Sequence, residues 1–557
     1  MVNIQTVSTE PYEGQKPGTS GLRKRVKVFQ QKNYTENFIQ AILESIPEAD
    51  GGASGATLVV GGDGRYYSDE VLQVIVKCSL GQGVGKLIVG RNGIVSTPAV
   101  SNLIRKYKAT GGILLTASHN PGGPDNDFGI KYNCSNGGPA PESVTNQIYE
   151  KSKVIKELKL GEAPKVDFSQ LGTQKIGSLT IEIIDGVQDY VELMKTIFDF
   201  DAIKAFFANN KDFKMLFDGM NGVTGPYGYR LFVEEFGLPE SSVMRYVPKP
   251  DFGGAHPDPN LTYAHDLVEA VKEKGYDFGA ASDGDGDRNM IIGKDAFVTP
   301  SDSVAIIAHY AKDAIPYFKK NGVNGLARSM PTSQAVDLVA KKMGVEHFEV
   351  PTGWKFFGNL MDAGRCSICG EESFGTGSDH IREKDGVWAI LAWLSIIAHV
   401  NKTKKAGVQD ILQDHYMTYG RNFFSRYDYE EVESQGAEDM VKRLGELIEK
   451  KELENKTFGQ FTIAKADDFE YLDPIDGSVS KHQGIRIIFK DGSRIIIRLS
   501  GTGSQGATVR LYVEKYSSDP SEYVKDAQVG LRPLIDVALE LSQLEKFTGR
   551  KEPTVIT

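Results

Sequence analysis

Short apolar runs and amphipathic stretches alternate along the first part of the chain. TLVVGGD at 57–63, KLIVG at 86–90 and GILLT at 112–116 are rich in aliphatic and β-branched residues, as buried strands are. Between and before them, residues 35–46 and 71–78 repeat apolar positions at helical spacing. Because strands that alternate with helices form layered α/β domains, this pattern predicts an α/β domain that ends near residue 190.

The alternation continues in two further blocks. Residues 214–225 predict a strand, a Gly-rich turn and a helix, and residues 278–293 predict two strands joined by an acidic loop. A helix is predicted over 300–320, and GLARSM followed by PTSQAVDLVAKKMG predicts a strand and then a helix ended by Gly344. The apolar stretch 384–402 predicts the helix that closes the third block.

The last part of the chain has a different pattern. The polar segment 401–410 predicts a connector, and 436–450 predicts a helix. FGQFTIAKA, GIRIIFK, SRIIIRLS and TVRLYVEKY then predict several consecutive strands, and the final helices are expected at about 519–546. Consecutive strands flanked by helices indicate an α+β domain.

Length and charge limit what this chain can be. At 557 residues it is too long for one hydrophobic core and should hold about three to five domains. The net charge of −10 disfavours a general nucleic-acid-binding surface, so an anionic ligand would need local basic groups. These features predict an ordinary globular protein that binds no nucleic acid.

Cysteines and apolar runs indicate an intracellular protein without a membrane segment. The four cysteines are too few and too scattered for a disulfide framework. Cys366 and Cys369 form a CxxC, but no second CxxC or histidine pair accompanies it, so this segment predicts a buried strand rather than a metal or redox site. The longest apolar run, 387–400, is shorter than the roughly 20 residues needed to cross a bilayer and predicts a core helix. The N-terminus lacks the basic-then-apolar pattern of a signal peptide.

The stretch after the third strand carries the first candidate chemistry. GILLT ends abruptly in Ala-Ser118-His119-Asn-Pro-Gly-Gly, which places Ser118 on a turn at the end of a strand. A hydroxyl beside a histidine, with Lys131 in the following strand-like run, can be a nucleophile or a phosphate carrier. The alternative is a plain turn or capping serine.

The acidic loop of the second block indicates a metal site. Asp283, Asp285 and Asp287 alternate with glycines, so in an extended loop all three carboxylates can face one cation. Oxygen ligands select Mg²⁺ or Ca²⁺, and an EF-hand is excluded because its sixth position holds Arg288 and its twelfth Lys294. The alternative is a solvated acidic turn.

Three further segments offer groups for an anionic sugar. The basic loop 16–25 contains Thr19, Ser20 and Arg23, although its residues alone favour a flexible arm. The loop 498–510 has glycines, hydroxyls and two arginines, which favour a phosphate site over an ordinary hairpin connection. Its candidate ligands are Arg498, Ser500, Thr502 and Arg510.

The third block supplies candidate sugar contacts. Thr352, Gly353 and Trp354 combine polar donors with a ring that either stacks on a sugar or packs in the core. In GEESFGTGSDHIREKDG, Glu371 and Ser373 can bind adjacent hydroxyls. The same segment has three positive groups, His380, Arg382 and Lys384. Lys384 is the candidate for acid–base catalysis or phosphate binding, while Arg382 and Glu383 are expected to be solvated.

Four of these motifs occur in the order of a known family. TASHNPGG, DGDGDR, GEESFG and RLSGTGS resemble the motifs of phosphoglucomutases in the α-D-phosphohexomutase superfamily, and the resemblance covers essentially the whole chain. It implies a phosphoserine at Ser118, with Mg²⁺ held by the three aspartates and the phosphate on Ser118. It also implies interconversion of glucose 1-phosphate and glucose 6-phosphate through glucose 1,6-bisphosphate, which turns round in the site.

The resemblance also implies a fold and residue roles. It implies a four-domain chain around a central cleft, with three related α/β layered domains of mixed sheets and a C-terminal α+β domain. The expected domains are 1–192 with the phosphoserine loop, 193–304 with the metal loop, 305–405 with the sugar-specificity loop and 406–557 with the phosphate-binding loop. GTSGLR, with Thr19 and Arg23, would form part of the active-site wall, and Arg288 would lie beside the metal and phosphate.

Several questions stay open on the sequence. Proton transfer could fall to His119, Lys131 or Lys384. The alternatives to a glucose enzyme are a relative acting on mannose or N-acetylglucosamine phosphates, a non-catalytic paralogue with a structural or trafficking role, and a simple phosphatase. We expect a cytoplasmic monomer that binds small sugar phosphates and no membrane.

Overall fold

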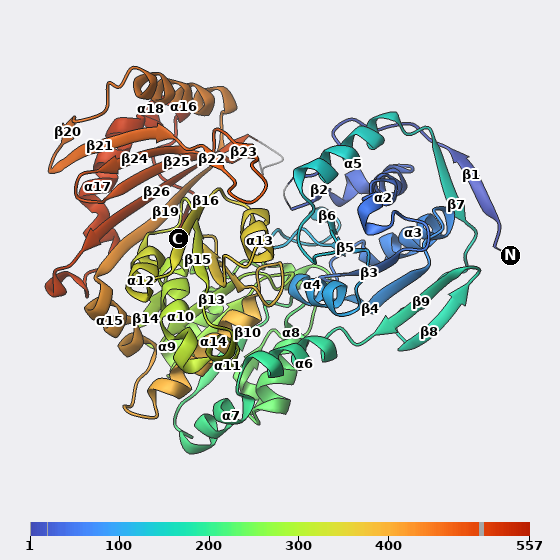
Figure 1. Ribbon diagram of the computed structural model, residues 1–557, viewed down its shortest axis with the longest axis horizontal. Coiled ribbons are helices and arrows are strands. Elements are labelled where there is room, and N and C mark those ends of the chain that lie inside the picture. Colours follow the sequence, from blue (N-terminus) through green and yellow to red (C-terminus); the bar gives the residue numbers. More distant parts are fainter. Residues whose placement is uncertain (1, 19, 501–505) are drawn as a thin grey trace.

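The computed structural model describes residues 2–18, 20–500 and 506–557. Four large sheets follow one another along the chain, and each lies within one of the four ranges expected from the sequence (Figure 1). The α/β architecture with mixed sheets is therefore confirmed. The boundaries between the ranges stay a prediction.

The first sheet delivers the segments that the sequence placed around Ser118. Its strand order is β2-β6-β5-β3-β4-β9-β8, with a parallel centre and antiparallel edges. The strands are β2 Leu22–Arg25, β3 Thr57–Gly62, β4 Lys86–Ile94, β5 Gly111–Leu115, β6 Asp127–Asn133, β8 Gly172–Ile176 and β9 Leu179–Ile184. The helices are α1 Val26–Phe29, α2 Tyr34–Glu44, α3 Ser68–Gly81, α4 Thr97–Lys106 and α5 Glu142–Val154. A separate ribbon joins β1 Ile4–Ser8 to β7 Glu157–Gly161 beside the N-terminus (Figure 1).

The second sheet carries the acidic loop between two antiparallel strands. Its order is β11-β10-β12-β13-β14. The strands are β10 Met215–Asp218, β11 Val243–Met244, β12 Phe278–Ser282, β13 Asn289–Gly293 and β14 Ala296–Val298. The helices are α6 Gln188–Ile197, α7 Phe200–Asn209, α8 Gly225–Gly228, the π-helical segment Tyr229–Glu235 and α9 His265–Lys274.

The third sheet, of order β16-β15-β17-β18, contains the end of GEESFG. Its strands are β15 Gly325–Ser329, β16 Glu346–Val350, β17 Ile368–Glu371 and β18 Gly375–Ser378. The helices are α10 Pro300–Ala314, α11 Pro316–Asn321, α12 Ala335–Met343, α13 Trp354–Asp362, α14 Gly386–Val400 and α15 Val408–Tyr419. The single helix expected over 300–320 is wrong: it breaks between α10 and α11, because Pro316 has no N–H to continue the ladder.

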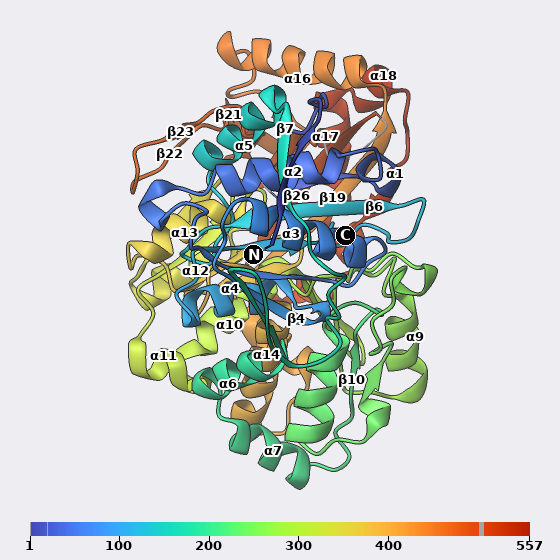
Figure 2. The same cartoon turned by 90° about the vertical axis from the view of Figure 1, so that its right-hand side faces the viewer.

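The fourth sheet is entirely antiparallel, in the order β20-β21-β24-β25-β26-β19-β27. Its strands are β19 Arg421–Val432, β20 Thr457–Phe458, β21 Phe461–Asp468, β24 Ile485–Phe489, β25 Arg494–Ser500, β26 Ala507–Ser517 and β27 Val555–Ile556, and a small hairpin pairs β22 Tyr471–Leu472 with β23 Val479–Ser480. The helices are α16 Ser434–Glu449, α17 Ala527–Ser542 and α18 Leu544–Thr548. In both views α16 and α18 lie at the outer end of the molecule (Figures 1 and 2).

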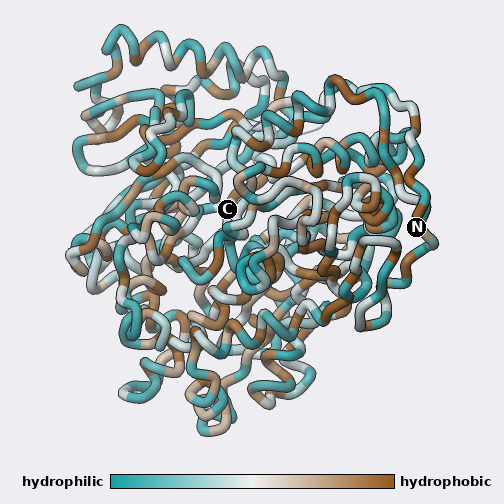
Figure 3. The backbone as a smooth tube through the Cα atoms, turned by 45° about the vertical axis from the view of Figure 1, so that its right-hand side comes forward, coloured by the Kyte–Doolittle hydropathy of each residue, from teal (hydrophilic) through white to brown (hydrophobic). Residues whose placement is uncertain are grey.

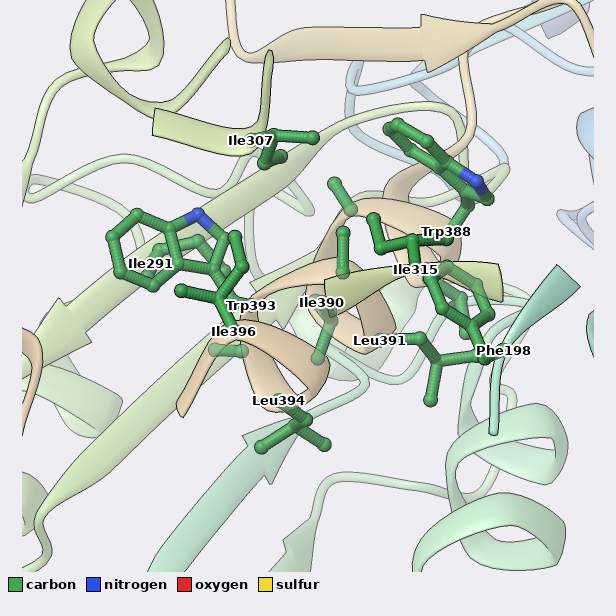
Figure 4. Packing of buried hydrophobic residues seen from close by; sticks show 14 of the residues in the cluster. Phe198, Ile291, Ile307, Ile315, Trp388, Ile390, Leu391, Trp393, Leu394 and Ile396 are labelled. Atoms are coloured by element: carbon green, nitrogen blue, oxygen red, sulfur yellow. The ribbon is translucent and has the colours of Figure 1, made fainter. Parts of the chain in front are cut away.

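One hydrophobic core spans the first three sheets. Val59, Ile88 and Leu114 face it from the first sheet, while the alternate residues of the same strands face a second core on the other side. At its centre lies α14, whose Trp388 and Trp393 are fully buried among residues of several elements (Figure 4). The core helix predicted at 387–400 is therefore confirmed, and hydrophobic segments concentrate in the interior (Figure 3). Within the part of the chain that the structure describes, no helix combines the length and apolar character needed to cross a bilayer.

The CxxC also lies where the sequence placed it. Cys366 and Cys369 are buried and free, at and just before β17. Among the described residues the only group of three metal-ligating side chains in mutual reach is elsewhere, in the acidic loop. The buried-strand interpretation of the CxxC is confirmed.

The C-terminal sheet has its own core and meets the third sheet through a face that combines a smaller apolar cluster with charged pairs. α16 and α17 pack on one side of it. The other side contacts β15, β16 and α13, where Glu349 of β16 pairs with Arg328, Arg486 and Arg494. α15, which begins inside the range 406–557, packs instead with α12 in the core of the first three sheets.

Candidate active site

Ser118 lies on a strained turn directly after β5. Its backbone has a φ of +53°, a left-handed conformation that non-glycine residues rarely adopt, and its side chain is buried. The Ser118 N–H donates to the hydroxyl oxygen of Thr116 over 2.8 Å, and its carbonyl accepts from Arg65 over 2.9 Å. Both backbone groups of the serine are therefore fixed.

A buried ion pair beneath the turn supports these contacts. Asp63 and Arg65 follow β3, and their charged groups lie 2.9 Å apart with no solvent exposure. The Thr116 hydroxyl donates to Asp63 over 2.6 Å. Sequence reasoning missed this support, although β3 and β5 are adjacent parallel strands whose carboxyl ends meet at one edge of the sheet.

The acidic loop lies against Ser118. Asp283, Asp285 and Asp287 offer carboxylate oxygens that all lie within 4.8 Å of one another, and the Ser118 hydroxyl donates to Asp283 Oδ2 over 3.0 Å. Burial raises the pKa of Asp283 well above its usual range, and the neighbouring Asp285 and Asp287 raise it further. The interpretation as a solvated turn is wrong, because all three carboxylates are buried.

These carboxylates fit a divalent cation. Oδ1 of Asp285 and Oδ1 of Asp287 are buried without a hydrogen-bond partner, which leaves two oxygens available as ligands. Thr97 donates to the other oxygen of Asp285 over 2.6 Å, and backbone N–H groups of Gly286 and Arg288 donate to Asp283. Three buried carboxylates with few partners need a counter-charge, and hard oxygen ligands suit Mg²⁺ or Ca²⁺.

Positive groups from all four domains surround His119. Reduced hydration lowers the pKa of His119 well below its usual value, and four cations lower it further: Arg288, Arg23, Arg510 and Lys384. Its Nδ1 lies 3.4 Å from the Ser118 hydroxyl. Arg23 is on β2 with its Nε buried and unpartnered, and Arg288 pairs with Asp258 over 3.2 Å while its own Nε has no partner. A site with several cations whose buried N–H groups lack hydrogen-bond partners suits an anionic ligand.

The two candidate lysines differ in their partners. Lys131 pairs with Glu383, which also accepts from Asn133 over 3.0 Å. Lys384 lies 3.5 Å from Asp287; burial alone lowers the pKa of Lys384, but Asp287 and Glu371 raise it above its ordinary value. Lys384 therefore contacts the metal loop, whereas the charge of Lys131 is paired with that of Glu383.

Other members of this segment are structural. Glu383 and Arg382, expected in a solvated loop, are buried instead; Arg382 pairs with Asp362 over 2.7 Å. His380 is held between Ser378 and Asp385 and stacks on Trp388. The sequence expectation failed here because packed partners far along the chain neutralise these charges.

Glu371 and Ser373 lie at the end of β17, both buried at the edge of the third sheet. The N–H of Gly353 donates to Glu371 over 3.0 Å, and the Thr352 hydroxyl is buried without a partner. Gly353 has a φ of +132°, which only glycine adopts without strain. The ring of Trp354 is buried and packs on Phe357 at 4.8 Å between centroids, while its Nε1 is buried without a hydrogen-bond partner.

The candidate phosphate grip belongs to the C-terminal sheet. Arg498 and Arg510 are cross-strand neighbours on β25 and β26. Arg498 donates to the hydroxyl of Tyr512 over 3.3 Å, and the Nε of Arg510 lies 3.8 Å from Asp428. Ser500 ends β25, while Thr502 and Thr19 lie outside the described residues.

A cavity of about 420 Å³ lies between segments of the first and third domains and the β22–β23 hairpin. Its walls include Gly18, Thr352 and Gly353 together with the hairpin residue Val479. Ligand entry from this side would pass between parts of the chain that are far apart in sequence.

Comparisons with known proteins agree with this arrangement. Models of the α/β/α domains I, II and III of phosphoglucomutase/phosphomannomutase match residues 14–159, 188–296 and 299–419, and a model of the phosphoglucomutase-1 C-terminal domain matches 421–554. A protein named phosphoglucomutase from Emericella nidulans is 59% identical over 561 aligned residues, and one from Schizosaccharomyces pombe is 59% identical over 557. Each alignment covers 100% of both chains.

A solved structure gives the same result. The Paramecium exocytosis-sensitive phosphoprotein pp63/parafusin, described as a phosphoglucomutase in its open form, has a TM-score of 0.90 and 47% identity, and the match covers 100% of this chain and 99% of that one. Both the sequence and the fold thus match over their whole length. The chain belongs to the phosphoglucomutase/phosphomannomutase family.

Proposed function

We propose that this protein interconverts glucose 1-phosphate and glucose 6-phosphate through a phosphoserine at Ser118. The observation that carries the proposal is the Ser118 hydroxyl, held 3.0 Å from a buried loop of three carboxylates and surrounded by cations. Relatives named phosphoglucomutase at 59% identity support the same reaction.

The chemistry is a phosphoryl transfer in two directions. The bond between phosphorus and Ser118 Oγ breaks as a sugar hydroxyl oxygen bonds to phosphorus, and the released Ser118 Oγ gains a proton as the sugar hydroxyl loses one. His119, Lys131 or Lys384 relays this proton. Glucose 1,6-bisphosphate then turns round, and Ser118 Oγ takes the other phosphoryl group. The fixed backbone of Ser118 keeps Oγ in line for both transfers.

We propose Mg²⁺ as the metal, held by Asp283, Asp285 and Asp287 and by an oxygen of the group on Ser118. When bound, it neutralises negative charge on the transferring phosphoryl group. Arg23 and Arg288 provide fixed positive charge on the same side, which favours the anionic substrate.

The remaining candidates bind the sugar and its second phosphate. The Glu371 carboxylate accepts hydrogen bonds from sugar hydroxyls, and the Ser373 hydroxyl accepts or donates them. Thr352 and Gly353 lie beside these two residues. The distal phosphate is held by Arg498 and Arg510. Ser500 and Thr502 complete this grip in the proposal, while Thr19 forms part of the active-site wall and Trp354 is a further contact for the sugar.

Turnover of glucose 1-phosphate tests the function. The assay contains Mg²⁺ and a trace of glucose 1,6-bisphosphate. It compares wild type with Ser118→Ala and with Ser241→Ala, which changes an exposed serine in the 3₁₀-helix Glu240–Ser242. We expect turnover in wild type and S241A and none in S118A, with phosphate transferred from the bisphosphate to wild type and S241A but not to S118A. Absence of turnover in wild type would overturn the glucose assignment.

A panel of mannose and N-acetylglucosamine phosphates separates this reaction from those of related phosphohexomutases. Release of inorganic phosphate at the rate of substrate loss would identify a phosphatase instead, and loss of all reactions would indicate a binding role. We further propose a cytoplasmic monomer. Sedimentation of the purified chain tests its oligomeric state.

A further inference from the structure

We propose that Arg426 is a positioning residue that fixes the distance between the sugar-binding loop and the distal phosphate grip. This inference rests on the proposed function. It starts from Glu372, the residue between Glu371 and Ser373, which the reaction itself does not use. Its carboxylate turns to the C-terminal sheet, where Arg426 of β19 donates to it over 3.0 Å.

The pair is buried on both sides of the contact. The side chain of Arg426 is 8% exposed and that of Glu372 3%. A charge so far from water is tolerated only when it is paired, so these two groups hold the loop and the strand in one arrangement. The loop is also held from the other side, because the backbone N–H of Glu372 donates to the hydroxyl of Thr332 over 2.8 Å.

The contact continues into the phosphate grip. The Nε of Arg426 lies 3.0 Å from Asp428, and the same carboxylate oxygen of Asp428 lies 3.8 Å from the Nε of Arg510. A continuous line of charges therefore runs from Glu372 through Arg426 and Asp428 to Arg510. Its two ends are the sugar-binding loop and the phosphate grip.

The register of the C-terminal sheet explains why these groups share one face. Arg498, Arg510 and Asp428 form one row across β25, β26 and β19. Two positions along, Tyr512 and Arg426 form part of the next row on the same face, because side chains alternate along a strand. This is the face that packs on β15 and α13 of the third domain (Figure 1).

A fixed distance between these two ends matters for a substrate that binds in two orientations. Each orientation places one phosphate on the C-terminal grip and the sugar hydroxyls on Glu371 and Ser373. If the bridge is lost, the grip loosens for substrate and for bisphosphate alike. Weaker binding that is shared by ground and transition states raises KM more than it lowers kcat.

The test compares Arg426→Met with Arg486→Met. Arg486 also pairs with a carboxylate of the third domain, Glu349, but it lies on β24 and contacts neither the sugar-binding loop nor Asp428. We expect R426M to raise KM for glucose 1-phosphate about 10-fold with kcat changed less than about 3-fold. R486M should lower thermal stability to a similar degree with KM changed less than about 2-fold.

Two further readouts separate positioning from folding. R426M should need about 10-fold more glucose 1,6-bisphosphate for half-maximal rate, because the intermediate escapes more often before it turns. Arg426→Lys, which keeps the charge, should restore part of both effects. Glu372→Gln should reproduce them, and the double variant should be no worse than R426M alone.

Equal effects of R426M and R486M on KM, or additive effects of R426M and E372Q, would overturn the bridge. If wild type does not turn over glucose 1-phosphate, the proposed function fails, and the same variants are compared by calorimetric affinity for glucose 1,6-bisphosphate. A loss in R426M and E372Q alone would still support the bridge, and unchanged affinity in both would overturn it.

Discussion

Thr116 connects the strained serine turn to the buried charge beneath it. Its hydroxyl accepts from the Ser118 N–H and donates to Asp63. Thr116→Val keeps the shape but leaves the Ser118 N–H without a partner and removes one hydrogen bond from Asp63, which stays paired with Arg65, so Ser118 should lose its fixed geometry. We expect kcat for glucose 1-phosphate to fall about 10- to 100-fold, equivalent to about 1.4–2.7 kcal/mol.

The matched control is Thr110→Val at the opposite end of β5, where the hydroxyl accepts only the Thr57 N–H. Its kcat should stay within about 2-fold of wild type. Equal losses in T116V and T110V would show that the strand, rather than the turn, is responsible.

His415 on α15 should make the protein acid-sensitive. Burial, together with the smaller effect of the nearby His309, lowers the pKa of His415 to about 3, and its Nδ1 has no partner. The unfolded chain, with a pKa near 6.5, takes up this proton first, so stability falls as pH drops below that value. Between pH 7 and pH 5 the loss should be about 2 kcal/mol.

His415→Phe fills the same aromatic surroundings without a titrating group. Thermal unfolding of wild type and H415F is compared between pH 7 and pH 5. The midpoint of wild type should fall more steeply, and parallel curves would rule out His415 as the acid-sensitive group.

At the scale of elements, the loop between β12 and β13 should be stabilised by the metal it binds. Its three buried carboxylates repel one another, so Asp285→Asn should relieve repulsion when chelator has removed divalent ions. We expect D285N to melt above wild type in chelator and below it in excess Mg²⁺. Its Mg²⁺ affinity should fall by more than the roughly 10–100-fold lost with an outer-shell partner.

The order of melting temperatures is measured by scanning calorimetry at both metal conditions. Asp295→Asn, in the turn after β13 and outside the cluster, is the control and should keep the wild-type order. If D285N melts below wild type in chelator too, the carboxylate stabilises the loop through the hydrogen bond from Thr97 instead.

The elements that the sequence predicted are those whose burial is apolar. β3, β4 and β5 are aliphatic runs buried on both faces, and α14 is apolar all round. β19 was missed because one face carries Arg426 and Asp428, and hydrophobic pattern cannot show that such residues are buried against another domain. The same limit hid Asp63, Arg65 and Glu372, whose partners lie far along the chain.

The candidate site divides in the same way. Ser118 and the three aspartates stand out because strand ends and spaced carboxylates have local signatures. The pairing of Lys131 with Glu383 links residues 252 positions apart and has no local signature. Its prediction would have needed the packing of the first and third sheets, which only the structure provides.

At the scale of the molecule, the chain should unfold in two units. One core spans the first three sheets around α14, whereas the C-terminal sheet packs its own core with α16 and α17. The interface between them combines an apolar cluster smaller than either core with charged pairs such as those of Glu349 with Arg486 and Arg494. Apolar cores unfold cooperatively, so damage inside one should spread through that core first.

Trp393→Ala tests this division. Trp393 is fully buried at the centre of the first core and donates to Ser303 over 2.9 Å, so its removal should cost about 3–5 kcal/mol. Hydrogen exchange should accelerate in β12 and β15 together, and much less in β25 and β26. Leu534→Ala in the C-terminal core is the reciprocal control and should accelerate exchange in β25 and β26 alone, at a cost of about 2–5 kcal/mol. Equal acceleration in all four strands for both variants would show that the interface between the third and C-terminal domains joins the two cores into one cooperative unit. The charged bridge through Arg426 would then contribute to stability as well as to position.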